Sequence, residues 1–497
     1  MEAHMAHTKR VRKNLLMYPL GTVGRDMVYN LFANFLLTFV LITKNLTPAQ
    51  LTAITGIMVA ARIFDALNDP IMGNIIEKTR TKWGKFKPWL LIGGITSSIV
   101  VIAAFNNANI KGWGFVVYFG IIYFLYSITY TMNDIAYWGM VPALSSDADT
   151  RNQFTSRATL FAGIGGTLAS VLIPMLTTGG MAIGGNAVTA YGVVSIIICI
   201  LSPLFMLFTL LGVQENRSDM SKPAPKISLK MIVKTITGND QLMWISLIFL
   251  LQQIGNGLVV GGLGSFYIYF EFGYAGGLYS LFTMLGMSVT ALLMVFYPVI
   301  SRRIQRKKLM GILQIVSVIG YMTMLLAGLF MPAVMIKFYV ITVGYMLANF
   351  GQYGFYLVMM ISIINTVEYN EHKHGKRSEA IISSLRPFLT KMGSAICVAL
   401  TSATYLIFRV TEITNGISSA ENAAAMDASY DKTGVINTLL MNVQRKQSIG
   451  LLVAMTLVPL AFMLAAYFLY KSKYKLDESE YERICKELET RRSQVNE

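Results

Sequence analysis

The stretch VQENRSDMSKPAPKISLK (213–230) divides the sequence into two parts of similar length. It is rich in charged residues and contains Pro223 and Pro225, so it does not continue an apolar helix. Each side of it holds six long apolar runs, near 18–42, 49–73, 89–106, 113–142, 156–177 and 189–213 before it, and near 239–270, 278–300, 309–331, 336–366, 379–408 and 448–471 after it. Because about 20 apolar residues in a helix cross the hydrocarbon core of a bilayer, this pattern predicts an all-α polytopic membrane protein. We expect twelve transmembrane helices in two six-helix halves.

This division predicts four parts of the chain: an N-terminal six-helix half (1–213), a cytoplasmic central linker (214–238), a C-terminal six-helix half (239–471) and a cytoplasmic tail (472–497). Two halves of this kind enclose a binding cavity in many transporters. The long segment 410–447 is rich in Ala, Asn and Ser, and we expect an external loop with short helices there. In the tail, Tyr481, Ile484 and Leu488 recur at helical spacing, which predicts a short amphipathic helix.

The charge content is low and unevenly distributed. Only 14% of the 497 residues are charged, against roughly 25% in soluble proteins, which argues against a soluble enzyme or a disordered chain. The net charge is +16, but most of the 42 lysines and arginines lie at the N-terminus, in the even-numbered connections and in the tail. This bias marks the cytoplasmic side. We therefore expect a multi-pass protein of the cytoplasmic (inner or plasma) membrane, with both termini cytoplasmic, a lipid bilayer around it and no nucleic acid as a partner. Three scattered cysteines, and four histidines outside the apolar runs, predict neither a disulfide framework nor a haem or zinc site.

Four aspartates lie inside the apolar runs, all of them in the N-terminal half: Asp26, Asp65, Asp69 and Asp134. A charge at mid-bilayer costs at least about 2.5–3.5 kcal/mol on insertion scales, so such residues usually mark an ion or substrate path.

The second run contains RIFDALNDPIMG (62–73). Arg62, Asp65, Asn68 and Asp69 are spaced at i, i+3, i+6 and i+7, so they share one face of a helix. Asp65, Asn68 and Asp69 offer oxygen atoms, the ligands that hard cations prefer, and we interpret this face as a cation site. An internal salt bridge between Arg62 and Asp65 is the alternative, and it would leave Asp69 unpaired.

The fourth run contains YTMNDIAYWGMVP (130–142), where Asp134 and Trp138 lie on one helix face. A carboxylate accepts hydrogen bonds from sugar hydroxyls, and an indole covers the apolar C–H side of a sugar ring. The alternative is a tryptophan that anchors the helix at the lipid interface. Thr131, three positions before Asp134, could add a hydroxyl oxygen to the cation cluster.

Three charged residues remain to be interpreted, two in the first run and one in the eleventh. Arg25 and Asp26 form either a buried pair that fixes helix packing or a pair that holds substrate hydroxyls, and the residues alone leave both open. Lys391 lies in the C-terminal half. We interpret it as a charge partner of the carboxylates that shifts as ions load and leave.

These segments resemble the glycoside–pentoside–hexuronide:cation symporters, a family of the major facilitator superfamily, over nearly the whole chain. The most specific parts are RIFDALNDPIMG (62–73), TKWGKFKPW (81–89), YTMNDIAYWGMVP (130–142) and VEYNEHKHGKRSEAIISSLRPFLTKMGSA (367–395). The resemblance implies the major facilitator fold. It also implies a cation site, which would hold Na⁺ if the protein is sodium-coupled, at Asp65, Asn68, Asp69 and Thr131. By the same resemblance the sugar site comprises Asp26, Asp134 and Trp138, with Arg25 and Tyr130 beside them, and Lys391 lies near both sites.

The chain departs from the family pattern at two positions. The acid that often precedes the VEY motif is Asn365 here, which would weaken a cytoplasmic gate contact. The arginine that the resemblance places early in the fifth run is matched by Arg157, with a spacing from Trp138 that differs by about two residues.

The sequence therefore predicts a symporter that carries a sugar or glycoside across the membrane by alternating access, coupled to Na⁺ or H⁺. We expect no enzyme activity, no cofactor other than the coupling ion, and function as a monomer. An alternative keeps the fold and changes the cargo to a uronate, a sulfonated sugar or a lysolipid. A polytopic enzyme or sensor is disfavoured, because the sequence shows no nucleophile–base pair, no metal cluster and no appended soluble domain.

Overall fold

The structure, a computed structural model, describes residues 2–145, 147–215, 229–375 and 379–496. The described chain is nearly all helical and contains no β-strand, only one isolated bridge between Thr81 and Gly84. The all-α prediction is confirmed. Most of the predicted central linker, residues 216–228, lies outside the described part.

Ten helices in the described part are long and apolar enough to cross a membrane. There are eleven if α14 (Glu379–Ile407) and α15 (Val410–Met426), which meet at a 90° bend, count as one span. The run expected at 239–270 is not among them; there the π-helical turn Val259–Leu263 separates α9 (Asp240–Leu258) from α10 (Gly264–Phe272). A multi-pass membrane protein is thus confirmed, but the number of twelve spans is not.

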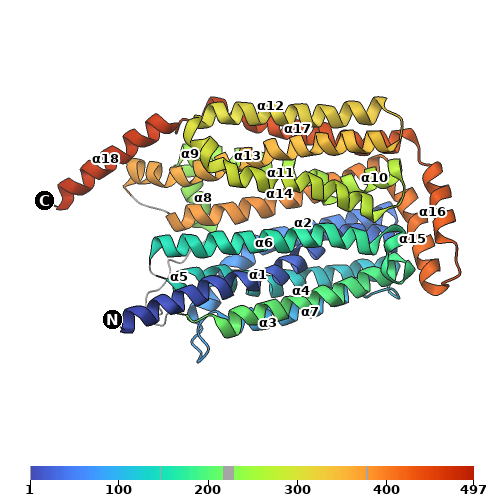
Figure 1. The fold of residues 1–497 in the computed structure, drawn as a ribbon, viewed down its shortest axis with the longest axis horizontal. Helices are drawn as coiled ribbons and strands as arrows, with labels where there is room; N and C mark the ends of the chain where they lie inside the picture. The colour runs from blue at the N-terminus through green and yellow to red at the C-terminus, as the bar shows by residue number, and fades with distance from the viewer. Residues whose placement is uncertain (1, 146, 216–228, 376–378, 497) are drawn as a thin grey trace. The chain divides into compact units, whose positions relative to one another are not determined.

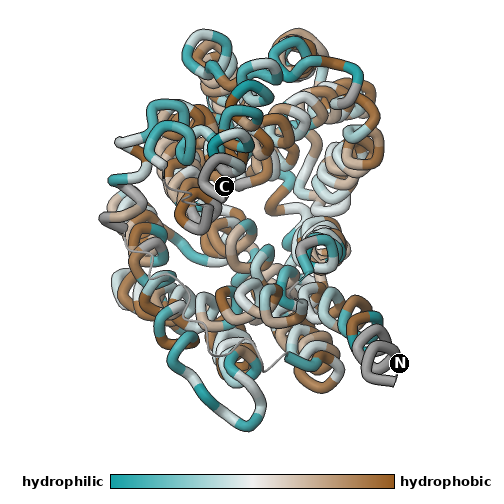
Figure 2. The backbone as a smooth tube through the Cα atoms, turned by 90° about the vertical axis from the view of Figure 1, so that its left-hand side faces the viewer, coloured by the Kyte–Doolittle hydropathy of each residue, from teal (hydrophilic) through white to brown (hydrophobic). Residues whose placement is uncertain are grey.

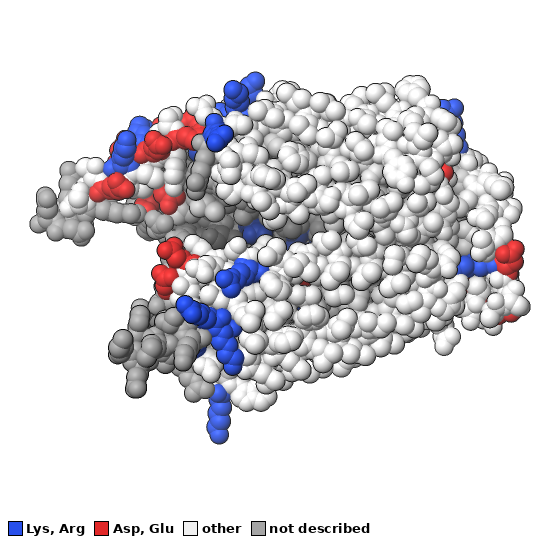
Figure 3. Space-filling view, viewed as in Figure 1, with Lys and Arg blue, Asp and Glu red and all other residues white. Residues whose placement is uncertain are grey.

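Charged and apolar side chains are distributed as expected for a protein that spans a bilayer. In Figure 3, Lys, Arg, Asp and Glu gather at the ends of the helices, and the surface between those ends is almost free of them. Figure 2 shows hydrophobic residues along the helices and hydrophilic ones in the loops nearest the viewer. Side chains such as Ile99, Leu160 and Leu211 are exposed on helix faces, as they would be in contact with lipid.

The chain forms two compact units, the first comprising residues 1–226, 268–281 and 405–443. Its main helices are α1 (Glu2–Thr43), α2 (Pro48–Lys78), α3 (Lys87–Phe105), α4 (Gly112–Gly139), the short α5 (Val141–Leu144), α6 (Ala148–Thr177) and α7 (Ala187–Gly212). α1 packs against α6 and α7, and α4 packs against α2 and α3 (Figure 1). A Cβ on Gly24 would lie 2.5 Å from Ser202 Cα, and one on Gly165 would lie 2.3 Å from the Val23 oxygen. Small residues therefore allow the close approach of α1 to both neighbours.

The second unit comprises residues 227–267, 282–404 and 444–497. Besides α9 and α14, its helices are α8 (Leu229–Gly238), most of α11 (Gly276–Arg303), α12 (Arg306–Phe330), α13 (Met335–His374), α17 (Arg445–Lys473) and α18 (Glu478–Asn496). In the predicted tail, Ile484 and Leu488 of α18 are buried in one apolar cluster with Val367 of α13. The amphipathic tail helix is confirmed.

The segment 405–443, which we call the strap, belongs to the C-terminal part of the sequence but packs within the first unit. It contains α15 and α16 (Lys432–Met441), as expected for short helices in 410–447. Asn415 exchanges two 2.9 Å hydrogen bonds with the backbone N–H and C=O of Leu46, and Asn422 Nδ2 donates to the Thr43 oxygen at 2.8 Å. These side-chain amides fix α15 to the segment that follows α1.

Candidate functional site

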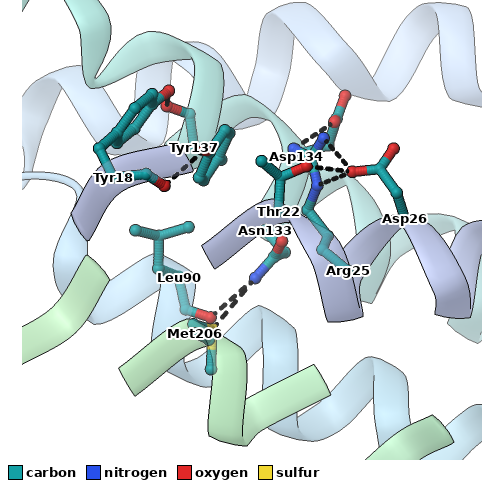
Figure 4. Close-up of polar contacts among 9 residues, drawn as sticks. All are labelled: Tyr18, Thr22, Arg25, Asp26, Leu90, Asn133, Asp134, Tyr137 and Met206. Atoms are coloured by element: carbon teal, nitrogen blue, oxygen red, sulfur yellow. Dashed lines mark hydrogen bonds and ion pairs between the residues drawn. The ribbon is translucent and has the colours of Figure 1, made fainter. Parts of the chain in front are cut away.

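A buried arginine links α1 and α4 of the first unit, in a group of side chains that we call the central cluster (Figure 4). Arg25 of α1 is 6% exposed. Its Nη2 and Nε lie 2.9 and 3.2 Å from Asp26 Oδ2, and its Nη1 lies 3.1 Å from Asp134 Oδ1 of α4. Thr22 Oγ1 donates to the same Asp26 oxygen at 2.6 Å. One guanidinium thus holds two carboxylates whose residues are 109 positions apart in the sequence.

Aromatic rings complete the surroundings of Arg25. Its guanidinium carbon lies 4.5 Å from the ring centre of Tyr137 and 5.4 Å from that of Trp138. Tyr137 is held by Tyr18, since each hydroxyl donates to the other residue's carbonyl oxygen, at 2.7 and 2.8 Å, and the two rings stack. Cation–π contacts and paired carboxylates offset the cost of burying a guanidinium. The cluster is therefore preorganised.

The charged side chains of this cluster differ in their exposure to solvent. The side chain of Arg25 is 7% exposed and that of Asp26 is 18% exposed, whereas that of Asp134 is 36% exposed. Two carboxylates against one guanidinium leave a formal charge of −1. The more exposed carboxylate has acceptor capacity beyond its bond to Arg25, because an ionised carboxylate offers about four lone-pair sites. This arrangement can accept hydrogen bonds from a hydroxylated ligand.

A second polar group lies between α2 and α4. Asp65 is 6% exposed, its Oδ1 accepts a hydrogen bond from Ser127, and its Oδ2 is 3.6 Å from Arg62 Nη1. Asp69 Oδ1 accepts from Thr131 Oγ1 at 3.4 Å. The Arg62–Asp65 alternative is therefore present as an ion pair, yet it occupies only one of the two acids.

Asn68 lies between these two aspartates in the sequence, and its Nδ2 is buried without a hydrogen-bond partner. Across the described residues, no group of three or more His, Cys, Asp or Glu side chains is placed to hold a metal ion. Any cation at this group would have to use amide and hydroxyl oxygens besides the carboxylates, as the Asn and Thr in the set permit.

Both groups draw on one face of α4. Ser127, Thr131, Asp134 and Trp138 are spaced at i, i+4, i+7 and i+11, so they lie along one stripe of the helix. Ser127 and Thr131 contact the α2 carboxylates, and Asp134 contacts Arg25. One rigid helix thus joins the two groups.

The remaining predicted residues lie at different places. The ring of Tyr130 packs against Tyr29 and Tyr126, at 5.4 and 5.3 Å between ring centres. Arg157 of α6 is exposed, and its Nη1 donates to the Leu15 oxygen at 3.4 Å, so the structure shows it with a backbone carbonyl and in no ion pair with a described carboxylate. Lys391 belongs to α14 in the second unit.

Three contact residues were missed in the sequence: Thr22, Ser127 and Tyr137. Ser127 precedes Thr131 by four positions, and Thr22 precedes Asp26 by four, so helical spacing alone could have identified both. Tyr137 follows Asp134 by three positions and meets the same criterion, but its contact with Arg25 of α1 depends on tertiary packing.

The fold and this site define a class: a multi-pass membrane transporter with a charged, aromatic-lined polar cluster inside its helices. A family model described as MFS/sugar transport protein matches residues 17–478, and the chain belongs to this family. Membership confirms the resemblance to the glycoside–pentoside–hexuronide:cation symporters, the major facilitator fold and the prediction that the chain is not an enzyme.

Named relatives cover most of the chain. A lactose permease of Leuconostoc lactis is 29% identical over 96% of this chain and 71% of the permease. A raffinose carrier protein of Pediococcus pentosaceus is 26% identical over 84% of this chain and 65% of the carrier. Among solved structures, a D-xylose–proton symporter aligns with a TM-score of 0.59 at 13% identity, covering 94% of this chain and 99% of the symporter. At that identity, the structural likeness concerns the fold alone.

Proposed function

We propose that this protein is a cation-coupled symporter of a neutral sugar or glycoside. The observation that carries the proposal is the joining of two polar groups by α4: the Arg25–Asp26–Asp134 cluster and the Asp65–Asp69 group. Relatives named for lactose and raffinose support a sugar as the cargo.

The chemistry of the first group suits a polyol. Asp26 and Asp134 accept bonds from ligand hydroxyls, Arg25 donates to ligand oxygens, and the indole of Trp138 covers the apolar side of a sugar ring. The formal charge of −1 on this cluster disfavours an anionic cargo, since like charges in a site of low dielectric repel strongly. A uronate, a sulfonated sugar or a lysolipid phosphate is therefore the weaker alternative.

The second group supplies the coupling site. Asp65, Asn68, Asp69 and Thr131 would bind Na⁺ through oxygen ligands, or carry H⁺ on a carboxylate. A cation there reduces the negative charge near α4 and orders the helix face that also holds Asp134. Sugar affinity then rises, and by linkage the sugar raises cation affinity by the same factor. The loaded protein would alternate access by movement of its two halves.

Uptake into proteoliposomes tests this proposal. With lactose and raffinose as labelled probes, an imposed inward Na⁺ or H⁺ gradient should drive accumulation. Asp134→Asn should abolish uptake and sugar exchange alike, whereas Asp69→Asn should keep exchange and lose gradient-driven accumulation. Asp427→Asn, in an exposed turn of the strap, is the matched control and should behave as wild type. Accumulation that ignores both gradients would rule out coupling, and full coupled uptake by Asp69→Asn would rule out the cation site.

The proposal also includes the orientation of the chain in the membrane. Basic segments flank the helices as the positive-inside rule requires for cytoplasmic termini, so we place both termini in the cytoplasm and the strap outside. We propose that the protein works as a monomer in the cytoplasmic membrane, with the coupling ion as its only cofactor. Protease access to the strap in right-side-out and inverted vesicles tests this orientation.

A further inference from the structure

The helix α9 of the second unit is exposed on two opposite faces. Met243 and Leu247 are 39% and 41% exposed, and Asn256, nine positions after Leu247, is exposed as well. At about 100° per residue, nine positions place Asn256 half a turn away from Leu247 around the helix axis. One exposed face of α9 is therefore apolar, as it would be in contact with lipid, and the opposite face is polar.

The polar face of α9 lies deep in the membrane-spanning part of the chain. α9, the π-helical turn and α10 run from Asp240 to Phe272, and Asn256 lies 16 positions from each end. No charged residue occurs between Asp240 and Glu271, and α9 packs against α13 and α17, which are both long and apolar enough to cross a membrane. Because an amide without a hydrogen-bond partner is costly in hydrocarbon, an exposed asparagine at this depth indicates a water-filled path.

Two residues present accessible amide groups on this face, Asn256 and Gln253. Within the described part of the chain, the side chain of Asn256 makes no hydrogen bond. Gln253 is partly exposed, and its Nε2 donates to Gln252 Oε1 at 3.0 Å. Gln252 is fully buried and donates in turn to the Gln352 oxygen at 3.3 Å. Gln252 is thus a positioning residue that orients Gln253 and leaves Gln253 Oε1 as an acceptor.

The same stretch of α9 lies beside α14, the helix that carries Lys391. A Cβ on Gly393 would lie 2.8 Å from Gln253 Cβ, and Cys397 Sγ donates to the Ile254 oxygen at 3.3 Å. The absence of a side chain at Gly393 thus allows α14 to pack closely against α9 at the level of Gln253. The predicted site residue of the second unit, Lys391, therefore belongs to the helix next to these amides.

Amide side chains match neutral hydroxyl groups. Each amide has two N–H donors and a carbonyl oxygen with two lone pairs, so it can bond to both the oxygen and the hydrogen of a hydroxyl. Because α9 has no charged residue after Asp240, its polar face attracts neither an anion nor a cation. A face of this kind favours a neutral ligand with several hydroxyls.

We propose that Gln253 and Asn256 contact the cargo from the second unit and determine its specificity for neutral, hydroxylated molecules. Gln253 Oε1 accepts a hydrogen bond from one hydroxyl, and Asn256 donates to one and accepts from another. The central cluster of the first unit supplies the charged contacts, and α9 supplies the uncharged ones. That the hydroxylated cargo is a sugar rests on the proposed function.

Cysteine reactivity in lipid nanodiscs tests whether water and cargo reach this face. Asn256→Cys is made in the full chain with Cys199, Cys397 and Cys485 replaced by serine, and Leu247→Cys on the opposite face is the matched control. We expect a charged, water-soluble methanethiosulfonate to modify Asn256→Cys about tenfold faster than Leu247→Cys, since lipid excludes the charged reagent. Lactose at about five times its dissociation constant for the variant should slow the reaction of Asn256→Cys about sixfold, the factor 1 + [L]/Kd.

Equal rates at the two positions would overturn the water-filled face, and a rate that lactose leaves unchanged would overturn the contact with the cargo. Thermal melting confirms that each variant is folded.

Lactose uptake into proteoliposomes tests the role in specificity. Asn256→Leu nearly keeps the side-chain size and removes the amide, so the half-saturating lactose concentration should rise about tenfold, as expected for the loss of one or two hydrogen bonds, while the maximal rate changes little. Asn256→Gln restores an amide and should recover most of the loss. Asn442→Leu makes the same chemical change at an exposed asparagine of the strap and should match wild type.

Equal half-saturating concentrations in Asn256→Leu and Asn442→Leu would overturn the inference, as would a loss of maximal rate alone. The proposed function fails separately, if wild-type proteoliposomes take up neither lactose nor raffinose.

Discussion

The ion pair that anchors the strap gives the sharpest stability prediction. Glu421 of α15 is fully buried, its Oε1 lies 3.4 Å from Lys432 Nζ, and its Oε2 accepts from the Ala187 N–H at 2.6 Å. Burial raises the pKa of Glu421 above its ordinary value, although Lys432 and the Ala187 N–H act in the opposite direction. Replacing Lys432 by Met removes the charge partner and leaves the acid in place.

The size of the effect follows from the options that Glu421 then has. It can stay ionised and unpaired, which costs about 3–5 kcal/mol for a buried group, or it can take a proton. With an unfolded-state pKa near 4.3, protonation costs about 3.7 kcal/mol at pH 7 and about 1.6 kcal/mol at pH 5.5. Because an acid whose folded pKa is raised loses stability as pH rises, the deficit of Lys432→Met should grow from pH 5.5 to pH 7 by about 2 kcal/mol.

Thermal unfolding in detergent, recorded at both pH values, measures this difference. The double variant Glu421→Gln/Lys432→Met is the control, because it buries no charge and keeps an acceptor for the Ala187 N–H. It should be more stable at pH 7 than Lys432→Met alone. If the deficit of Lys432→Met is the same at both pH values, or if the double variant shows the sum of two losses, the reasoning from a buried unpaired carboxylate is wrong.

Three further predictions concern Arg25, Ser127 and Lys44. Arg25→Gln leaves two adjacent carboxylates without a cation, so it should cost about 3–5 kcal/mol of stability at pH 7 and abolish sugar uptake; a wild-type melting temperature would contradict the bridge seen here. Ser127→Ala removes the hydroxyl bound to Asp65, worth about 1–2 kcal/mol, so the cation concentration for half-maximal uptake should rise roughly five- to thirtyfold, whereas an unchanged value would separate Asp65 from coupling. Burial, and then the positive charge of Lys111, lower the pKa of Lys44 from 10.5 to about 8, so between those values the folded protein has released a proton that the unfolded chain still holds. Wild type should therefore gain melting temperature relative to Lys44→Met as pH rises from 8 to 10, and parallel pH curves would argue against a buried lysine.

The fold was predictable because hydropathy is a local signal. The length of the apolar runs indicated the membrane-spanning helices, and the spacing of Tyr481, Ile484 and Leu488 by three and four residues indicated α18. The packing of the strap was not predictable, since it depends on contacts between residues distant in sequence, such as Asn415 with Leu46 and Glu421 with Ala187. Lys432 carried no pattern that distinguished it from an ordinary loop lysine.

The candidate site, too, was predictable from the sequence only in part. Adjacency in the sequence suggested an Arg25–Asp26 pair, and the structure contains it, but the third member, Asp134, arrives from α4. Spacing within α2 predicted that Asp65 and Asp69 share a face, and their partners Ser127 and Thr131 again lie on α4. Helical periodicity identifies the residues that share one face of a helix. Which helix that face contacts depends on tertiary packing.

Burial of a charge in a membrane protein does not by itself identify a binding site, and a comparison of two ion-pair clusters of the first unit shows what does. Glu421 and Lys432 are 0% and 9% exposed at their side chains, and their bonds end in each other and in backbone groups. Such a pair is too deeply buried for a ligand to reach, so its role is to hold the strap. In the central cluster, Arg25 is equally buried, but its partner Asp134 is 36% exposed. A fixed cation with one accessible carboxylate can exchange a bond with a ligand at little structural cost, and that difference in accessibility separates the site from the anchor.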